Sequence, residues 1–459
     1  MPTPQASRLE ARLRSKTARV GVVGLGYVGL PLLVELARSG YDAVGFDLDE
    51  RKVAALTDGE SYIPDVPSNE VAALRAQGRL SATTDFSQLR TIDSVNICVP
   101  TPLRKTKDPD MSFVVAAAET IAAHLHAGML VILESTTYPG TTEELVQPIL
   151  EKSGLVAGRD FFLAFSPERV DPGNPRFNTQ NVPKVVGGLT PVCGSLAATL
   201  YSGAIESVVP VSSPRVAEMV KLLENTFRAV NIGLVNEIAL MCDALGLNVW
   251  EVVEAAATKP FGFMPFYPGP GLGGHCIPID PFYLSWKAKQ NGFEARFIEL
   301  AGHVNGAMPH AVVRKIADAL NTRKKPVNGS RILVAGVTYK RDIDDVRESP
   351  ALDVIGGLLK QGAIVSYSDP HVRQLDDAHR PVGGSVPSVE HLDASTLREF
   401  DCVAILTDHS AFDYAAILRY SDLIVDTRNA IKKSAPHVFR LGAPAQADHA
   451  TASEQFAAV

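Results

Sequence analysis

The sequence predicts an α/β protein with two doubly wound sheet domains joined by a helical domain that contains one long central helix. Three observations predict this fold class. A strand, a glycine turn, a helix and a second strand follow one another near the N-terminus, and the same order returns after residue 330. Between them, residues 214–245 carry apolar side chains at helical spacing. A chain of 459 residues, of which 46% are hydrophobic, is long enough for several cores.

We expect five segments along the chain, with boundaries where the composition changes. The changes fall at the first apolar strand, at the start of the long helix, at the linker "RKKPVNGS", and where the last residues become small and polar. The expected segments are an N-terminal tail (1–16), a first sheet domain (17–213), a helical domain (214–322), a second sheet domain (323–440) and a flexible tail (441–459).

The first sheet domain opens with a dinucleotide-binding pattern. An apolar strand at 19–23 runs into Gly24-x-Gly26-x-x-Gly29, which opens a helix, and the next strand ends at Asp47. In such a Rossmann-like unit the glycines admit a pyrophosphate to the helix N-terminus. Asp47 would accept hydrogen bonds from the ribose 2′-hydroxyl and repel a 2′-phosphate, so NAD is favoured over NADP. A glycine turn that serves packing alone is the alternative.

Three later strands end in polar loops. They are "SVNICVPTP", "LVILESTTYPGTT" and "DFFLAFSPERV", with helical stretches between them. This alternation is typical of an open parallel sheet, whose ligands collect at the carboxyl ends of the strands. We therefore expect Thr101, Thr136 and Glu168 to point toward one crevice.

The helical domain carries an unusual cysteine. Cys276 follows a glycine-rich turn in "PGLGGHCIPID" and precedes Asp280, whereas a cysteine packed for its bulk would sit in an apolar strand or helix. Glycines let a backbone approach a ligand closely, so we expect ligands beside this loop; a small buried hydrophobe beside a turn is the alternative. On the long helix, Lys221 and Asn225 are one turn apart, so they share a face.

Composition and charge exclude several classes of protein. A formal net charge of −7 argues against a nucleic-acid surface. No apolar run approaches the length of a membrane span, and the first residues lack the apolar core of a signal peptide. The 5 cysteines are scattered without metal-binding or disulfide spacing, which indicates a reducing cytoplasm and no metal.

The second sheet domain repeats the plan of the first without the full glycine pattern. The glycine-to-aspartate spacing of Gly40 and Asp47 returns in Gly362 and Asp369. Its first loop, "VTYKRDIDDVRESP", contains three basic residues, Lys340, Arg341 and Arg347, which predict a second, phosphorylated ligand.

The order of these motifs resembles the UDP-glucose/GDP-mannose dehydrogenase family, the nucleotide-sugar 6-dehydrogenases. The resemblance covers about residues 17–440 and rests on "GLGYVGLP", "VPTP", "ESTTYPGTT", "SPER", "KLLENTF", "GGHCIPID" and "VTYKRDIDDVRESP". It implies two Rossmann-like domains, one for NAD and one for a UDP-sugar. It also implies oxidation of a sugar C6 alcohol to a carboxylate with two NAD per product, in a homodimer or higher homo-oligomer.

The resemblance also implies roles for individual residues. Cys276 would form a thiohemiacetal and then a thioester, and Lys221, with Asn225 beside it, would stabilise oxyanions at C6. Asp280, Glu168 and Thr136 would handle water and protons, although the residues alone do not assign which carboxylate acts in which step. The expected cofactor contacts are Gly24, Gly26, Tyr27, Val28, Gly29, Asp47, Lys52, Pro100, Thr101, Thr136, Cys276 and Arg347. The expected substrate contacts are Glu168, Arg169, Lys221, Asn225, Tyr267, Gly271, Gly273, Tyr339, Lys340 and Arg428.

The segment "SPERVDPGN" resembles the branch of the family that acts on UDP-N-acetylated hexosamines. Arg169 follows Glu168 directly, and Pro172 and Pro260 stand where the UDP-glucose branch has a glutamate and an arginine. The expected substrate is UDP-N-acetylglucosamine, in surface-polysaccharide (O-antigen or capsule) synthesis. UDP-N-acetylgalactosamine, UDP-N-acetylmannosamine and UDP-glucose are the alternative sugars. An NAD-binding regulatory protein and a UDP-sugar epimerase are the alternative functions.

Overall fold

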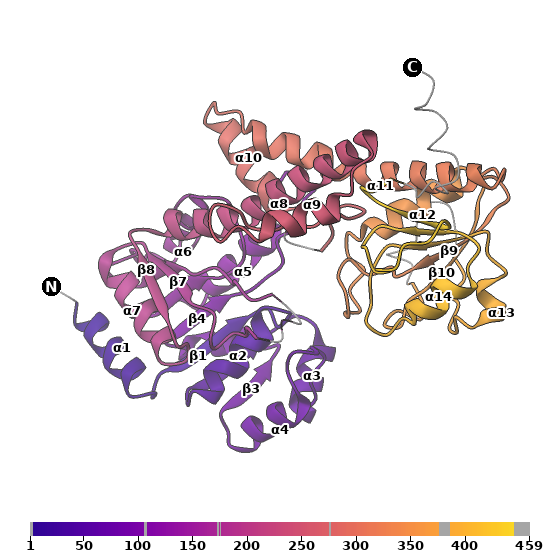
Figure 1. Cartoon of the computed structure of the whole chain (residues 1–459). Coiled ribbons are helices and arrows are strands. Elements are labelled where there is room, and N and C mark those ends of the chain that lie inside the picture. The colour runs from indigo at the N-terminus through magenta and orange to yellow at the C-terminus, as the bar shows by residue number, and fades with distance from the viewer. Residues whose placement is uncertain are drawn as a thin grey trace. The chain divides into compact units, whose positions relative to one another are not determined.

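The structure is a computed structural model, and it describes residues 3–104, 108–171, 174, 176–274, 277–375 and 386–444. The chain forms two compact units, each with one sheet (Figure 1). The first unit is Met1–Glu224 with Phe282–Phe293, and the second is Asn225–Pro281 with Glu294–Val459. Within the described ranges, no helix has the length and apolar character to cross a membrane.

The sheet of the first unit is eight-stranded, in the order β3-β2-β1-β4-β5-β6-β7-β8. Its strands are β1 (Arg19–Val23), β2 (Asp42–Phe46), β3 (Leu80–Thr83), β4 (Ser94–Ile97), β5 (Leu130–Leu133), β6 (Phe162–Phe165), β7 (Lys184–Gly188) and β8 (Val208–Val211). The strand order reverses at β1, which lies between β2 and β4, and ligands of such sheets bind at this point. The predicted open parallel sheet is confirmed, and β6 and β7 are its one antiparallel pair among the described strands.

Helices cover both faces of this sheet, as a doubly wound fold requires. The helical segments are α1 (Pro4–Arg14), α2 (Gly29–Arg38), α3 (Glu50–Asp58), α4 (Ser68–Ala76), η1 (Phe86–Thr91), α5 (Ser112–Ala122), η2 (Thr142–Val146), α6 (Gln147–Glu151) and α7 (Pro191–Ser202). Apolar residues of α1, α2, α4 and α7 share one core with the strands. Those of α5 and α6 pack in the core on the opposite face.

The N-terminal residues differ from the expected tail, because most of them form α1. The Thr3 side chain accepts a hydrogen bond from the Ala6 N–H at 3.2 Å and caps the helix. Leu9 and Leu13, at helical spacing, are buried in the first core. Packing of this apolar stripe against α7 holds the helix on the sheet domain.

The sheet of the second unit is five-stranded and parallel throughout, in the order β10-β9-β11-β12-β13. The strands are β9 (Arg331–Ala335), β10 (Ile364–Ser368), β11 (Cys402–Ile405), β12 (Ile424–Asp426) and β13 (Val438–Arg440). Its helices are α12 (Pro350–Lys360), α13 (Ala394–Leu397) and α14 (Tyr414–Tyr420). One face packs against α12 and the end of α11 (Arg296–Thr322), and the other against α13 and α14.

The predicted long helix is confirmed as α8 (Pro214–Leu245), with 32 residues. The other helices of this region are α9 (Val249–Ala257) and α10 (Asp280–Gln290). The chain stays packed beyond the expected start of the flexible tail at 441, because Leu441 and Ala443 are buried and the Trp250 Nε1–H donates to the Leu441 carbonyl at 2.9 Å. The other expected domain boundaries remain predictions.

Candidate active site

The glycine turn after β1 leaves room for a ligand at one glycine and packs tightly at the other two. Gly24 has a φ of +91°, and a Cβ there would lie 2.7 Å from the Cys98 carbonyl oxygen. A Cβ at Gly29, the first residue of α2, would lie 1.8 Å from the Gly24 carbonyl oxygen. At Gly26, by contrast, no atom of the described residues lies within 4 Å of a Cβ. Open space beside a helix N-terminus fits the pyrophosphate of a dinucleotide.

The carboxylate of Asp47 is held beside this turn. Its Oδ2 accepts hydrogen bonds from the Leu25 N–H at 2.8 Å and from Lys52 Nζ at 3.1 Å. Its Oδ1 accepts one from the Asp49 N–H at 2.9 Å. Lys52 is therefore ion-paired with the carboxylate that we expect to bind the ribose. A 2′-substituent on the ribose would lie near both the Asp47 carboxylate and the Lys52 ammonium group.

The remaining predicted cofactor contacts of the first unit follow the turn and the ends of β4 and β5. Tyr27 and Pro100 are exposed, Val28 and Thr136 are half-buried, and Thr101 is buried. Because β4, β5 and β6 are parallel neighbours, the loops bearing Thr101, Thr136 and Glu168 leave the same edge of the sheet.

Glu168 is fixed by several donors of the first unit. Its Oε1 accepts the N–H groups of Arg169 and Val170, each at 2.7 Å, and its Oε2 lies 3.3 Å from Lys184 Nζ. The buried Lys221 on α8 donates from Nζ to the Glu168 carbonyl at 2.6 Å. Burial by itself raises the pKa of Glu168, but the charge of Lys184, the two backbone N–H groups and the charge of Lys221 together bring it below its usual value.

Two further charged residues complete what we call the carboxylate–lysine cluster: Glu134, Lys184, Glu168 and Lys221. Lys184 Nζ lies 2.6 Å from Glu134 Oε2, and both side chains are buried. Burial would lower the pKa of Lys184, yet the two carboxylates raise it above its usual value. Sequence reasoning missed both residues: Glu134 lies in "ESTTYPGTT", where only Thr136 has a predicted role, and Lys184 lies in none of the family motifs.

Arg169, a predicted substrate contact, is engaged within the first unit. Its Nη2 lies 2.6 Å and its Nε 3.3 Å from the carboxylate of Glu224, and its Nη1 donates to the Pro183 carbonyl at 2.6 Å. This two-pronged pair uses the planar geometry of the guanidinium. It holds the loop after β6 to α8, and a substrate role for Arg169 remains a prediction.

In the second unit, Asn225 and Asp280 lie together. The Asn225 side-chain amide donates to Asp280 Oδ2, and both side chains are buried. Asn225 is one helical turn after Lys221 on α8, as the spacing predicts. Cys276 lies outside the described residues, and so does Pro172.

The glycines before Cys276 pack closely against protein atoms of the second unit, and their expected contacts with ligands remain predictions. A Cβ at Gly273 would lie 2.4 Å from the Tyr339 Cβ, and one at Gly274 would lie 2.8 Å from its ring. The Gly274 N–H donates to the Arg347 carbonyl at 3.0 Å. Glycine is needed here so that the cysteine loop can lie against the basic loop after β9. A Cβ at Gly271 would come within 3.0 Å of Pro350.

The predicted UDP contacts lie on loops of the second unit. The Arg428 guanidinium is 3.3 Å from Asp408 and borders Gly269, where a Cβ would lie 2.5 Å from its Nη1. Arg347 pairs with Asp345 at 2.6 Å. Lys340 is half-buried. Tyr267 stacks on Trp250 with ring centroids 6.1 Å apart.

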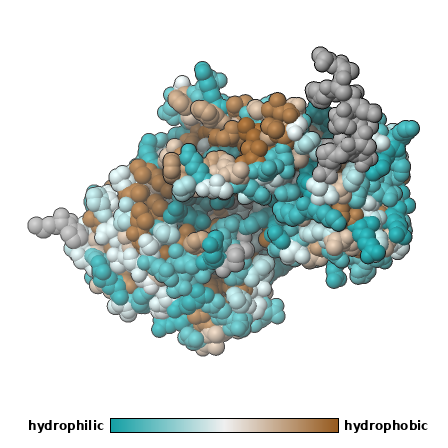
Figure 2. All heavy atoms as spheres, viewed as in Figure 1, coloured by the Kyte–Doolittle hydropathy of each residue, from teal (hydrophilic) through white to brown (hydrophobic). Residues whose placement is uncertain are grey.

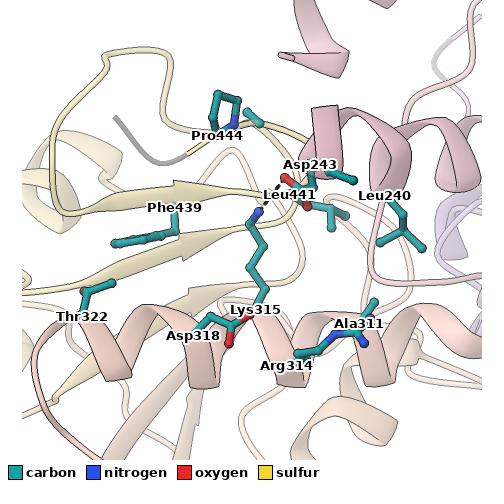
Figure 3. A pocket seen from close by; sticks show the side chains of 12 residues that line it. Leu240, Asp243, Ala311, Arg314, Lys315, Asp318, Thr322, Phe439, Leu441 and Pro444 are labelled. Carbon is teal, nitrogen blue, oxygen red and sulfur yellow. Dashed lines mark hydrogen bonds and ion pairs between the residues drawn. The ribbon is translucent and has the colours of Figure 1, made fainter. Parts of the chain in front are cut away.

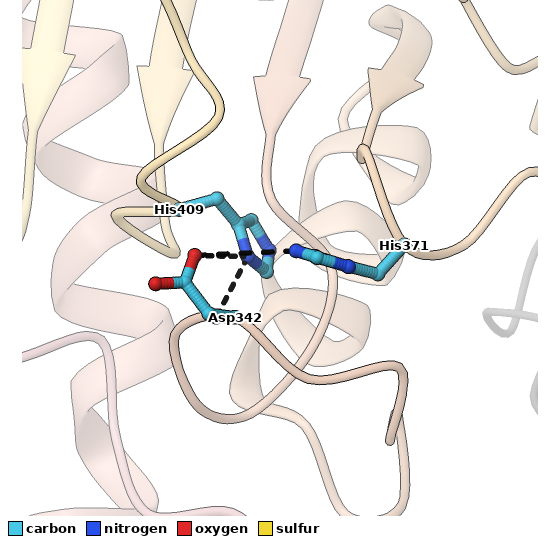
Figure 4. Close-up of side chains that lie close together, drawn as sticks. All are labelled: Asp342, His371 and His409. Carbon is cyan, nitrogen blue, oxygen red and sulfur yellow. Dashed lines mark hydrogen bonds and ion pairs between the residues drawn. The ribbon is translucent and has the colours of Figure 1, made fainter. Parts of the chain in front are cut away.

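A histidine cluster beside the basic loop has the composition of a metal site. Asp342, His371 and His409 bring their potential ligand atoms within 4.8 Å of one another (Figure 4). However, His409 Nδ1 accepts the Asp342 N–H at 3.0 Å, and its Nε2 lies 3.0 Å from Asp369 Oδ2. Both ring nitrogens therefore hold the basic loop to Asp369, which occupies the position that corresponds to Asp47.

A separate hollow of about 470 Å³ lies in the second unit (Figure 3). Residues of α8, α11 and the β13 region line it, and the ion pair of Lys315 with Asp243 at 2.8 Å crosses it. None of its lining residues is among the predicted site residues, so it is distinct from the groups described above.

Comparison with known proteins identifies related enzymes. The chain is 39% identical over 374 residues to UDP-N-acetyl-D-glucosamine 6-dehydrogenase of Pseudomonas aeruginosa, covering 80% of this chain and 87% of that protein. It is 36% identical over 421 residues to NDP-N-acetyl-D-galactosaminuronic acid dehydrogenase of Ralstonia solanacearum, covering 89% and 95%. The solved structure of UDP-D-ManNAc dehydrogenase from Pyrococcus horikoshii matches with a TM-score of 0.82 at 33% identity, covering 92% of this chain and 99% of that one.

Three family models match the chain in sequence order. They are the NAD binding domain (18–205), the central domain (215–307) and the UDP binding domain (333–433) of the UDP-glucose/GDP-mannose dehydrogenase family. The first match contains the glycine turn and most of the carboxylate–lysine cluster, and the last contains the basic loop. The chain therefore belongs to the UDP-glucose/GDP-mannose dehydrogenase family, and its cofactor is NAD.

Proposed function

We propose that the protein oxidises the C6 hydroxyl of UDP-N-acetylglucosamine to the carboxylate, giving UDP-N-acetylglucosaminuronic acid for surface-polysaccharide synthesis. The observation that carries the proposal is the contact of Lys221 with the loop "SPER", because it brings a buried cation to the residue that we expect to act as base. The relatives support an N-acetylated sugar, since their names specify N-acetylglucosamine, N-acetylgalactosaminuronic acid and ManNAc.

The chemistry requires a covalent step to retain the aldehyde between two oxidations. NAD, when bound, takes up the hydride in each oxidation. The Cys276 thiolate adds to the aldehyde carbon to form a thiohemiacetal, whose oxidation leaves a thioester. Water then breaks the C–S bond, which releases the acid and restores the thiol.

The described residues fit supporting roles in these steps. Lys221 stabilises the oxyanion at C6 with its ammonium group, together with the Asn225 amide. Asp280, held by Asn225, accepts the proton of the alcohol. Glu168 is the base for thioester hydrolysis, since its lowered pKa keeps it ionised at neutral pH, and Thr136 holds the water.

The coenzyme preference gives a first prediction. Wild type should use NAD far better than NADP, because a 2′-phosphate near Asp47 places like charges together at a cost of several kcal/mol. Asp47→Ala should narrow the preference, since it removes this repulsion and releases Lys52 to face the phosphate. The double variant Asp47→Ala with Lys52→Ala should lose much of the increase in NADP use that Asp47→Ala alone gives. The measurement is kcat/KM for both coenzymes; equal use of both by wild type would contradict the role of Asp47.

Tyr339, Lys340 and Arg428 are the proposed contacts of the UDP group, and Arg347 is the proposed contact of the NAD pyrophosphate. Cationic side chains suit phosphate oxygens, and arginine can bind two of them at once. Their position on loops of the family's UDP binding domain supports the assignment.

The substrate prediction is tested with a panel of UDP-sugars. UDP-N-acetylglucosamine should exceed UDP-glucose in kcat/KM by at least about tenfold, equivalent to about 1.4 kcal/mol of transition-state binding. UDP-N-acetylgalactosamine and UDP-N-acetylmannosamine are the competing substrates, and each becomes the assignment if it is turned over faster. The measurement is initial NADH production together with the mass of the product.

The same panel separates the other functions. An epimerase would change the sugar without net NADH, and a regulatory NAD-binding protein would produce neither change. Two NADH per sugar with a mass gain that matches an acid is the result expected of a dehydrogenase.

We infer that the enzyme is a homodimer or a higher homo-oligomer. Large apolar side chains are exposed on the helical part of the second unit, and Figure 2 shows apolar atoms gathered over this region. They include Phe227, Leu234, Met241, Leu245 and Val252 on α8 and α9. Exposed apolar side chains gathered on one part of a protein are typical of a protein interface, and a second copy is the proposed partner.

A further inference from the structure

The buried Glu134–Lys184 pair has no role in the chemistry proposed above, yet it contacts the proposed base. Lys184 Nζ lies 2.6 Å from Glu134 and 3.3 Å from Glu168, and its side chain is only 4% exposed. A buried ion pair adds little net stability on average, because desolvation offsets most of the attraction. The contact of Lys184 with Glu168 therefore points to a role in the site.

The antiparallel strand explains how Lys184 reaches Glu168. In the register of β6 and β7, Ala164 pairs with Gly188 and Phe165 with Gly187. Continuing this register beyond β6 brings Lys184 opposite Glu168. A parallel β7 would begin at the other edge of the sheet, so the reversed direction is what delivers the cation to the carboxyl ends of β4, β5 and β6.

Both carboxylate oxygens of Glu134 accept hydrogen bonds, and one of them holds Lys184. Its Oε1 accepts hydrogen bonds from the Asn96 Nδ2 at 3.0 Å and from the Tyr201 hydroxyl, and its Oε2 accepts from Lys184. The Asn96 amide also donates to the Tyr201 oxygen at 2.8 Å. All these side chains are buried, so Glu134 holds the ammonium group in place and is not itself exposed to a substrate.

We propose that Lys184, anchored by Glu134, is a positioning residue that orients Glu168 and keeps it ionised for thioester hydrolysis. The proposal rests on the proposed function of Glu168. Backbone N–H groups hold Oε1 and Lys184 holds Oε2, so both oxygens of the carboxylate are fixed in place. The charged or titratable groups around Glu168 are Lys184 on β7, Lys221 on α8, and Glu134 and Cys98 after β5 and β4.

The test is the pH dependence of acid release in single turnovers by Lys184→Met. Loss of the cation should move the acid limb of this rate to higher pH by at least about one unit, since an opposite charge at this distance lowers a carboxyl pKa by about 1–3 units. NAD binding and the first NADH formed should stay near wild type. Lys184→Arg keeps the cation and should return the acid limb of the acid-release rate to the wild-type pH. Lys315→Met, which breaks the half-buried pair with Asp243, is the matched control and should leave the profile unchanged.

An unshifted acid limb in folded Lys184→Met would overturn the proposal, and so would a loss of NAD binding in proportion to activity. If Lys184→Met does not fold, Glu134→Gln with Lys184→Met removes both buried charges and should show the same shift. If that double variant also fails to fold, the Glu134–Lys184 pair is required for folding, and the positioning role is overturned.

Glu168→Gln separates this proposal from the proposed function. If Glu168→Gln releases acid at the wild-type rate, the role of Glu168 as base is wrong, and the Lys184 proposal is overturned with it. If Glu168→Gln stalls as the thioester while Lys184→Met keeps the wild-type profile, only the Lys184 proposal is overturned.

Discussion

Cys276→Ala should abolish formation of the uronic acid while NAD and UDP-sugar binding stay near wild type. The change removes one sulfur from a loop that backbone contacts hold, such as the hydrogen bond from Gly274 to the Arg347 carbonyl. The first oxidation needs no covalent bond to the enzyme, so aldehyde and the first NADH should still form. The second oxidation acts on the thiohemiacetal, which alanine cannot form. Product mass and the NADH-to-sugar ratio measure both steps.

Serine at position 276 should also fail, because its hydroxyl is far less ionised than a thiol and forms the adduct slowly. Cys242→Ala is the matched control, since Cys242 is a buried cysteine of the same unit and has no predicted role. Wild type should lose activity to iodoacetamide and be protected by substrate, because the four cysteines in the described part of the chain are all buried. Near-normal acid production by Cys276→Ala with two NADH per sugar would disprove the thiohemiacetal mechanism.

The parts of the fold that were predictable are those with a strong local pattern. The glycine turn, α2 and the acid after β2 could be predicted because close packing requires glycine at 24 and 29. The helix α8 could be predicted because its apolar spacing continues over many turns. The helix α1 was missed because its apolar stripe is short and becomes buried only by tertiary contact with α7.

The direction of β7 decided what could be predicted of the site. Nothing in "PKVVGG" distinguishes a parallel from an antiparallel strand, since both are short apolar runs. Lys184 lies beside Glu168 only because β7 is antiparallel to β6. A residue brought to a site by strand direction has no local signal, whereas Glu168 and Thr136, at the ends of strands, could be placed at the sheet edge in advance.

The glycines before Cys276 give a second example. Their number predicts a close approach of the backbone to a ligand, which remains a prediction; the structure shows in addition a close approach to Tyr339 and Pro350. Glycines in a sequence indicate that a neighbouring group leaves no space for a side chain. They do not indicate whether that group is a ligand or another part of the protein. The two loops concerned are separated by more than sixty residues in sequence, so their contact could not be read from either one.

Lys221→Met should slow every chemical step, in contrast with Cys276→Ala. The lysine is buried, and its Nζ lies 2.6 Å from the Glu168 carbonyl, so methionine removes a cation that solvent cannot replace and leaves that carbonyl without this donor. An alkoxide or oxyanion at C6 develops in both oxidations and in hydrolysis. Loss of one preorganised donor to such an oxyanion costs roughly 100- to 1,000-fold in rate, and kcat should fall by about this factor.

The rate of the first NADH formed in a single turnover distinguishes the two variants. It should fall as steeply as kcat in Lys221→Met, because the first alkoxide already needs the cation, but should be much less affected in Cys276→Ala. Lys221→Arg should recover part of the rate, since it keeps the charge with a different reach. Lys287→Met is the matched control, because Lys287 is a half-buried lysine of the first unit, paired with Glu144 at 2.6 Å. A wild-type first turnover in folded Lys221→Met would remove Lys221 from the oxyanion site and leave it only the role of holding the Glu168 loop.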